Sequence, residues 1–239
     1  MKLNIREIRG ESWDFSKSFF YAALSDSICK QPSPYFSILF IKKGVSPNTI
    51  TLLMIIFGVI GGVLFAIPFF YSKCFAVFAY WLWYIFDCSD GEVARYTKKF
   101  SKYGKELDWV AHLSCHSLFY LATFLCFYQE RKYNMMLLAV LIIIFISAEL
   151  IGRNLIAFDS FLFEGVRFSR VHTRTSIVRF LTVKIFNFPT FVLFFPIFYV
   201  IDISFNLKFA YYFFIIWGTC LSLYSIKEFI RYIVFFYKN

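Results

Sequence analysis

The sequence predicts an all-α polytopic membrane protein with six transmembrane helices that follow an N-terminal interfacial amphipathic helix. Hydrophobic residues make up 59% of the 239 residues and aromatic residues 23%, and the mean hydropathy is +0.63. A soluble domain of this length is nearer half apolar. The apolar residues also form continuous runs of about 20 residues, the length that a helix needs to cross a bilayer. Such runs favour helices over the alternating strands of a barrel, because a helix satisfies its own backbone polar groups in lipid.

The N-terminal segment, residues 1–45, is predicted to lie at the membrane surface. Pro32 and Pro34 separate its helix from the first transmembrane span. Because the segment is mixed and charged, we expect no cleavable signal peptide. The apolar side chains that can share one face of an interfacial helix are Trp13, Phe15, Phe19, Phe20 and Leu24.

The transmembrane domain is expected over residues 46–239. Its first span begins at Pro47, which suits the first turn of a helix. Gly58, Gly61 and Gly62 lie in that span and allow a neighbouring helix to approach closely, so we assign them to packing. The six apolar runs that predict the spans lie at about 46–70, 73–93, 104–128, 134–158, 177–201 and 207–236.

Lysine and arginine fall unevenly on the two sides of this layout. The N-terminal segment, the connections after the second and fourth spans and the C-terminal end carry 21 of the 25, and the other side carries 4. The positive-inside rule places both termini and these two connections in the cytoplasm. We therefore expect an integral protein of the cytoplasmic (inner) membrane.

The net charge and the cysteines exclude other classes. In a membrane protein, a net charge of +10 indicates orientation and attraction to anionic headgroups and phosphates, so we expect no nucleic-acid partner. The six cysteines are scattered, and no spacing suggests a zinc site or a disulfide framework.

Four ionisable side chains are expected to meet at the cytoplasmic edge of the second and third spans. Asp87 and Asp90 are three residues apart, and Asp108 and His112 are four apart, so each pair shares a helix face. A short basic connection makes the two helices antiparallel neighbours. Three converging carboxylates would repel one another unless a cation lay among them. Oxygen ligands favour Mg²⁺ or Mn²⁺, so the pattern predicts a metal site for phosphate chemistry.

An ion-pair network is the alternative, in which Arg95, Lys105 and other cations neutralise the aspartates. Two features favour a ligand site instead. Gly91 and Ala94 remove side chains where a ligand would need room, and Arg95 can pair with phosphate.

The spacing of these residues resembles the signature of the CDP-alcohol phosphotransferases, often called phosphatidyltransferases. That signature reads D-x-x-D-G-x-x-A-R-x8-G-x3-D-x3-D. Every gap and every fixed position matches except the last, where this chain has His112. The matching residues are Asp87, Asp90, Gly91, Ala94, Arg95, Gly104 and Asp108. Pro47 and Asn48, followed by Thr51, also resemble a motif at the start of the family's first span.

The resemblance implies an enzyme that transfers a substituted phosphate group. An acceptor hydroxyl attacks the β-phosphorus of a CDP-alcohol, CMP leaves and a phosphodiester forms, in phospholipid or related glycolipid biosynthesis. It implies two divalent ions, Mg²⁺ or Mn²⁺, held by Asp87, Asp90, Asp108 and the residue at the last position. The residues expected at the cytidine nucleotide are Gly91, Ala94, Arg95, Gly104, Asn48 and Thr51.

His112 stands where the family has its candidate general base and metal-touching aspartate. Imidazole is a common general base and also a metal ligand, so His112 can do both jobs. Alternatively the site holds one ion firmly and His112 only accepts the proton. In a third interpretation the chain is a degenerate member that binds without turnover.

The partners expected from the resemblance are a CDP-alcohol donor, a lipid or polar alcohol acceptor and membrane lipids, and a homodimer is left open. Arg153 and Arg174, in the basic connection after the fourth span, are candidates for an acceptor or lipid phosphate, although orientation in the membrane also explains that cluster. Two other function classes remain: a non-catalytic partner subunit and a small transporter. A transporter more often carries charges near the midplane and repeated halves.

Overall fold

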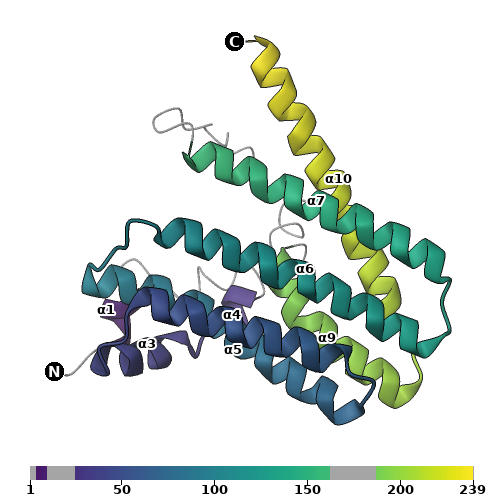
Figure 1. The fold of residues 1–239 in the computed structure, drawn as a ribbon, viewed down its shortest axis with the longest axis horizontal. Helices are drawn as coiled ribbons and strands as arrows, with labels where there is room; N and C mark the ends of the chain where they lie inside the picture. Colours follow the sequence, from purple (N-terminus) through teal and green to yellow (C-terminus); the bar gives the residue numbers. More distant parts are fainter. Residues whose placement is uncertain (1–3, 10–24, 162–186, 239) are drawn as a thin grey trace.

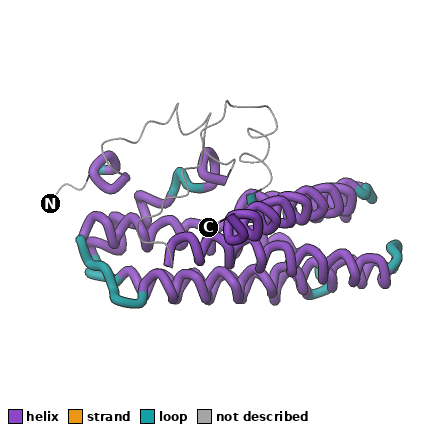
Figure 2. The backbone as a smooth tube through the Cα atoms, turned by 90° about the horizontal axis from the view of Figure 1, so that it is seen from above, coloured by secondary structure: helices purple, strands orange, loops and turns teal. Residues whose placement is uncertain are grey.

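The structure, a computed structural model, describes residues 4–9, 25–161 and 187–238, and within those ranges it contains helices and short connections but no strands (Figure 1). The prediction of an all-α protein is confirmed. The elements are α1 (Ile5–Arg9), the π-helix η1 (Ser25–Cys29), α3 (Ser33–Lys42), α4 (Pro47–Ala66), α5 (Phe70–Thr97), α6 (Gly104–Glu130), α7 (Met135–Phe161), α9 (Phe188–Phe205) and α10 (Phe209–Lys238). Figure 2 shows the same helices turned by 90°.

Five helices among the described residues are long and apolar enough to cross a membrane. They are α4, Gly104–Glu130 of α6, Met135–Leu155 of α7, α9 and Phe209–Val234 of α10, and they match five of the six expected spans. Helix α5 coincides with the remaining span but is not among the five. It carries five charged residues and several tyrosines and tryptophans, which lower its hydropathy. An integral membrane protein is therefore supported, and the count of six stays a prediction.

The local sequence explains where two of these helices begin. Ser46 caps α4, because its Oγ accepts a hydrogen bond from the Thr49 amide at 3.2 Å, and Pro47 follows as the first helical residue. Asn187 caps α9 in the same way through the Thr190 amide at 2.8 Å. Helix α9 thus begins later than the fifth expected span, whose first residues, up to 186, lie outside the described ranges. The interfacial helix expected around residues 13–24 lies outside them as well.

The glycines of α4 let it pack closely against both α5 and α6. A Cβ atom on Gly58 would lie 2.5 Å from Cys115 Sγ, and one on Gly61 would lie 2.9 Å from the Tyr80 ring. Both distances are too short for real atoms, so these positions require glycine. The packing role predicted for these glycines is confirmed.

Helices α9, α10 and α7 complete the bundle. Helix α9 packs against α5 and α10, and α7 packs against α10 and α6. Aromatic rings fill the space between them. Phe191 on α9 stacks on Trp217 of α10 with ring centroids 3.9 Å apart, and Phe119 of α6 meets Phe191 edge-on at 5.4 Å.

The connection from α5 to α6 lies at the same end of the bundle as α1 and α3, whereas the α4–α5 and α6–α7 connections lie at the opposite end (Figure 1). Helix α3 is tied to α5 by a buried carboxylate. Glu92 accepts hydrogen bonds from the Ser33 and Ser37 hydroxyls at 2.8 and 2.7 Å. The end that carries the signature residues is therefore covered on one side by α3.

Candidate active site

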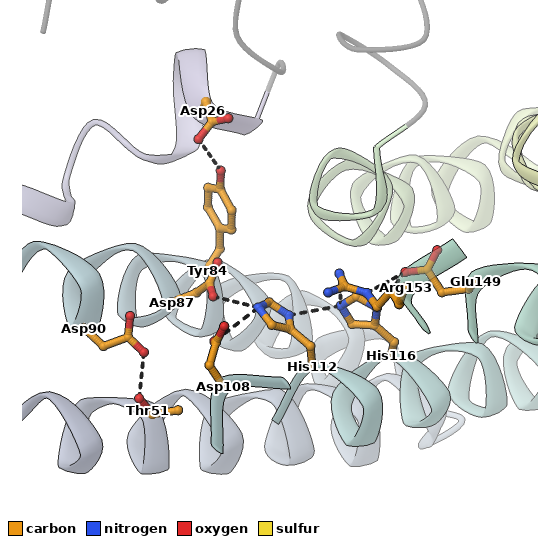
Figure 3. A network of polar contacts seen from close by, with 10 residues as sticks. All are labelled: Asp26, Thr51, Tyr84, Asp87, Asp90, Asp108, His112, His116, Glu149 and Arg153. Atoms are coloured by element: carbon orange, nitrogen blue, oxygen red, sulfur yellow. Dashed lines mark hydrogen bonds and ion pairs between the residues drawn. The ribbon is translucent and has the colours of Figure 1, made fainter. Parts of the chain in front are cut away.

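Asp87 of α5 meets Asp108 and His112 of α6 near the end of the bundle that carries the α5–α6 connection (Figure 3). His112 Nε2 lies 3.0 Å from Asp87 Oδ1 and 3.4 Å from Asp108 Oδ1. Spacing along α6 puts Asp108 and His112 on one face. We expected α5 and α6 to be direct neighbours, but each packs mainly on α4, and the Asp87 side chain reaches across to His112. This confirms that residues from the two helices converge.

These three side chains fit a divalent cation. One ligand atom from each lies within 4.8 Å of the other two, and this is the one such group of three within the described ranges. Two carboxylate oxygens and an imidazole nitrogen are suitable donors for a divalent ion. The Asp108 side chain is 46% exposed and the His112 side chain 12%, so the group opens to the surface on the Asp108 side.

Asp90 is turned away from this group. Its Oδ2 accepts a hydrogen bond from Thr51 Oγ1 at 2.7 Å, which joins α5 to α4 (Figure 3). The structure thus brings together three of the four expected ligands, and it pairs the fourth with a residue expected at the nucleotide. A second ion would therefore have to be bound through the other carboxylate oxygen of Asp90, Oδ1.

Two glycines of the signature lie against polar side chains. The three heavy atoms nearest to a Cβ placed on Gly91 all belong to the Arg95 guanidinium, the closest at 3.0 Å. A Cβ on Gly104 would lie 2.8 Å from Ser101 Oγ and 3.9 Å from Asn48 Oδ1. Ala94 is half-buried beside them, and Asn48 and Arg95 are exposed. Gly104 of α6 therefore lies close to Asn48 of α4, and contact of these residues with a nucleotide stays a prediction.

A polar network behind His112 extends through His116 of α6 to α7. His112 Nδ1 lies 3.3 Å from His116 Nε2, and His116 Nδ1 lies 3.0 Å from Glu149 Oε1 on α7. Arg153 Nε donates to the same Glu149 oxygen at 2.9 Å. Glu149 and Arg153 are four residues apart and share a face of α7, but nothing in the sequence indicates that α7 presents them to His116.

Tyr84 and Arg153 connect the site to other parts of the bundle. Tyr84, one turn before Asp87, donates its hydroxyl to Asp26 Oδ1 of η1 at 3.0 Å, so the N-terminal region also contacts the helix that holds the site. Arg153 lies on α7 against Glu149 and His116. Arg174, the other candidate for a phosphate, lies outside the described residues.

Comparison with protein families agrees with this geometry. The model of the CDP-alcohol phosphatidyltransferase family matches residues 44–224. The chain belongs to this family. The match extends from the end of α3 into α10, so it includes the whole Asp87–His112 region and the network on α7. A comparison with curated proteins finds no match.

As a CDP-alcohol phosphatidyltransferase family member, the chain is expected to use a CDP-alcohol donor and an alcohol acceptor, and family members are typically dependent on a divalent metal. The Asp87, Asp108 and His112 group is the place in the described structure where such an ion fits.

Proposed function

We propose that the protein transfers a phospho-alcohol, either phosphatidyl or a polar headgroup phosphate, from a CDP-alcohol to an acceptor hydroxyl and releases CMP. The product is a phosphodiester of a phospholipid or a related glycolipid. The observation that carries this proposal is the convergence of Asp87, Asp108 and His112 within 4.8 Å, inside a region that the family model matches.

Each signature residue has a role in this proposal. Asp87, Asp108 and His112 would hold Mg²⁺ or Mn²⁺, and Asp90 would contribute to a second ion through Oδ1 while Thr51 holds its Oδ2. A bound cation neutralises charge on the diphosphate and makes CMP a better leaving group. The residues that leave room for the cytidine nucleotide or contact it are Asn48, Thr51, Gly91, Ala94, Arg95 and Gly104.

His112 cannot act as ligand and general base through the same atom at the same time. Nε2 faces the two carboxylates and Nδ1 faces His116, so both roles need Nε2. We propose the ligand role, because Nε2 lies among the other ligand atoms. The Asp108 carboxylate, whose side chain is 46% exposed, is then the base that an incoming hydroxyl can reach first.

The proposed setting is the cytoplasmic membrane with the active site facing the cytoplasm. The uneven distribution of lysine and arginine supports this orientation. Arg153 and Arg174 are proposed for an acceptor or lipid phosphate, although the contacts of Arg153 with Glu149 and His116 also support a positioning role. Nothing in the described part of the chain supports the homodimer, and we leave it out.

Release of CMP tests the proposal. Purified protein in lipid nanodiscs would be incubated with CDP-diacylglycerol or with CDP-linked headgroups, with Mg²⁺ or Mn²⁺ and with membrane lipids as acceptors. We expect divalent-dependent release of CMP with at least one donor. If no donor gives CMP and CDP does not raise the melting temperature, the enzyme is excluded and a non-catalytic subunit becomes the better account.

A further inference from the structure

Glu149 and Arg153 of α7 form, with His116 of α6, a buried polar group directly behind His112 (Figure 3). Glu149 Oε1 lies 3.0 Å from His116 Nδ1 and 2.9 Å from Arg153 Nε. Arg153 Nη2 lies 3.3 Å from His116 Nε2. Among the hydrogen bonds and ion pairs of the described residues, one contact joins this group to the cation site. It is the 3.3 Å approach of His116 Nε2 to His112 Nδ1.

The arginine decides where the hydrogen atoms of His116 lie. A guanidinium has donors and no acceptor, so His116 Nε2 must be an acceptor. The ring is then neutral with its hydrogen on Nδ1, which donates to Glu149. The two neighbours on α7 favour the same tautomer of His116. The Arg153 guanidinium can only donate to Nε2, and the Glu149 carboxylate can only accept from Nδ1.

The tautomer of His116 in turn determines which ring nitrogen of His112 carries the hydrogen. His112 Nδ1 and Arg153 Nη2 both lie 3.3 Å from His116 Nε2 and share its one lone pair. A second lone pair on His112 Nδ1 would repel it, so Nδ1 is assigned a hydrogen. When the ring of His112 is neutral, the lone pair is therefore on Nε2. That atom lies 3.0 Å from Asp87 Oδ1 and 3.4 Å from Asp108 Oδ1. Its lone pair repels the two carboxylates unless a cation lies between the three atoms.

Packing keeps both rings in this orientation. His116 is 3% exposed and stacks on Phe188 of α9, with ring centroids 3.4 Å apart. The Trp83 ring meets His112 and His116 edge-on at 6.0 and 6.1 Å. The stack on Phe188 therefore restrains the plane of the His116 ring.

We propose that Glu149 and Arg153 are positioning residues that act through His116 to present His112 Nε2 as a nitrogen ligand, and that the site therefore prefers a first-row transition dication such as Mn²⁺ over Mg²⁺. Partners of this kind set the tautomer and ring orientation of ligating histidines in metal proteins. Replacement of a carboxylate by imidazole favours transition dications over Mg²⁺. The inference rests on the proposed function only for the presence of the cation.

Binding of Mn²⁺ to the full chain in nanodiscs, without nucleotide, tests the inference. Free Mn²⁺ would be followed by its electron paramagnetic resonance signal, and nitrogen ligation by the ¹⁴N modulation of the bound ion. We expect ¹⁴N modulation in the wild-type protein and none in the His112→Asp variant. Wild-type protein that binds Mn²⁺ without ¹⁴N modulation would overturn the inference.

The contribution of α7 is measured with the double variant Glu149→Leu/Arg153→Met. It removes both partners of a buried pair together and so avoids an isolated buried charge. We expect Mn²⁺ to bind about 10- to 100-fold more weakly. In the His112→Asp background the same double change should have little effect, because a carboxylate ligand needs no tautomer. Equal losses in both backgrounds would indicate a merely structural role and would overturn the proposal.

A control variant and an affinity ratio sharpen the test. Asp202→Asn alters another buried carboxylate, which accepts a hydrogen bond from the Ala210 amide at 2.6 Å at the α9–α10 connection, and it should leave Mn²⁺ affinity unchanged. The ratio of Mn²⁺ to Mg²⁺ affinity should fall in His112→Asp, and an unchanged ratio counts against the proposal. These measurements need no turnover. A protein that binds Mn²⁺ through nitrogen and responds to the α7 double variant as expected, but releases no CMP, would contradict only the proposed function.

Discussion

Thr51 Oγ1 lies 2.7 Å from Asp90 Oδ2, so the first turns of α4 hold an aspartate of the signature on α5. Thr51 is buried, and its hydroxyl has this carboxylate and its own helix carbonyl, Pro47 O, as partners. The bond fixes the direction of the Asp90 carboxylate. Thr51, at the start of the first span, can therefore affect activity through Asp90 on α5.

Thr51→Val should lower CMP release by about 10-fold, because Asp90 loses the donor that orients it. Thr51→Ser keeps a hydroxyl and serves as the matched control, with activity close to wild type. The measurement is the initial rate of CMP release at saturating donor, with melting temperatures to show that both variants fold. Wild-type rates in Thr51→Val would show that this bond has no role in turnover.

Asp87→Asn tests the cation group itself. The amide keeps the size of the side chain but removes the charge that a divalent ion needs, so CMP release should fall by about 100-fold and Mn²⁺ affinity with it. Glu106→Gln is the control, because Glu106 is exposed in the first turn of α6 and is not part of the group. Comparable losses in the two variants would mean that overall surface charge, and not ligation, governs activity.

The buried Glu92 predicts an effect on stability. It is 1% exposed, and the hydroxyls of Ser33 and Ser37 each donate to one of its oxygens. Ser33→Ala/Ser37→Ala leaves this carboxylate buried without those donors, at a cost of about 2 kcal/mol or more. We expect the melting temperature in detergent to fall by about 5 °C.

Rescue separates this explanation from general damage to α3. Adding Glu92→Met to the two serine changes removes the charge and fills a similar volume. The melting temperature should then recover most of the loss. A triple variant that melts as low as the double one would show that the serines stabilise α3 in some other way.

Most of the helical layout can be predicted from the sequence, because the thickness of a bilayer fixes the length of an apolar run. The runs around Pro47 and Met135 therefore predict α4 and α7 closely. The meeting of Asp87 with Asp108 and His112 was also predictable. Helical spacing fixes the faces, and the short connection keeps the end of α5 near the start of α6, although both helices pack mainly on α4.

The contacts between distant helices are not determined by the sequence pattern. Glu149 and His116 are separated by 33 residues, and hydropathy indicates only that each lies on an apolar helix. Whether α7 packs on α6 depends on the fit of many apolar side chains, which leaves no periodic signal. For the same reason the pairing of Asp90 with Thr51 became apparent only with the packing of α4 on α5.

Gly58→Val should disrupt the contact of α4 with α5 and α6. Even the first carbon of the new side chain would lie 2.5 Å from Cys115 Sγ and 2.9 Å from Trp83 Cδ1, so α4 must move outward. We expect a loss of about 2 kcal/mol or more, seen as a lower melting temperature and weaker Mn²⁺ binding. Val59→Leu, on the exposed side of the same turn, should change neither. Equal melting temperatures for Gly58→Val and the wild-type protein would contradict the close packing.

His112 is the residue where this chain departs from the family signature, and two substitutions decide its role. His112→Ala removes Nε2 from the cation group, so CMP release should fall by about 100-fold or more. His112→Asp restores the family's residue in a similar position and should retain activity, with its best cation shifted from Mn²⁺ toward Mg²⁺ because all protein ligands are then oxygens. The measurement is CMP release over a titration of each ion. Turnover in His112→Ala at the wild-type rate would show that Nε2, which lies 3.0 Å from Asp87 Oδ1, is not a required ligand.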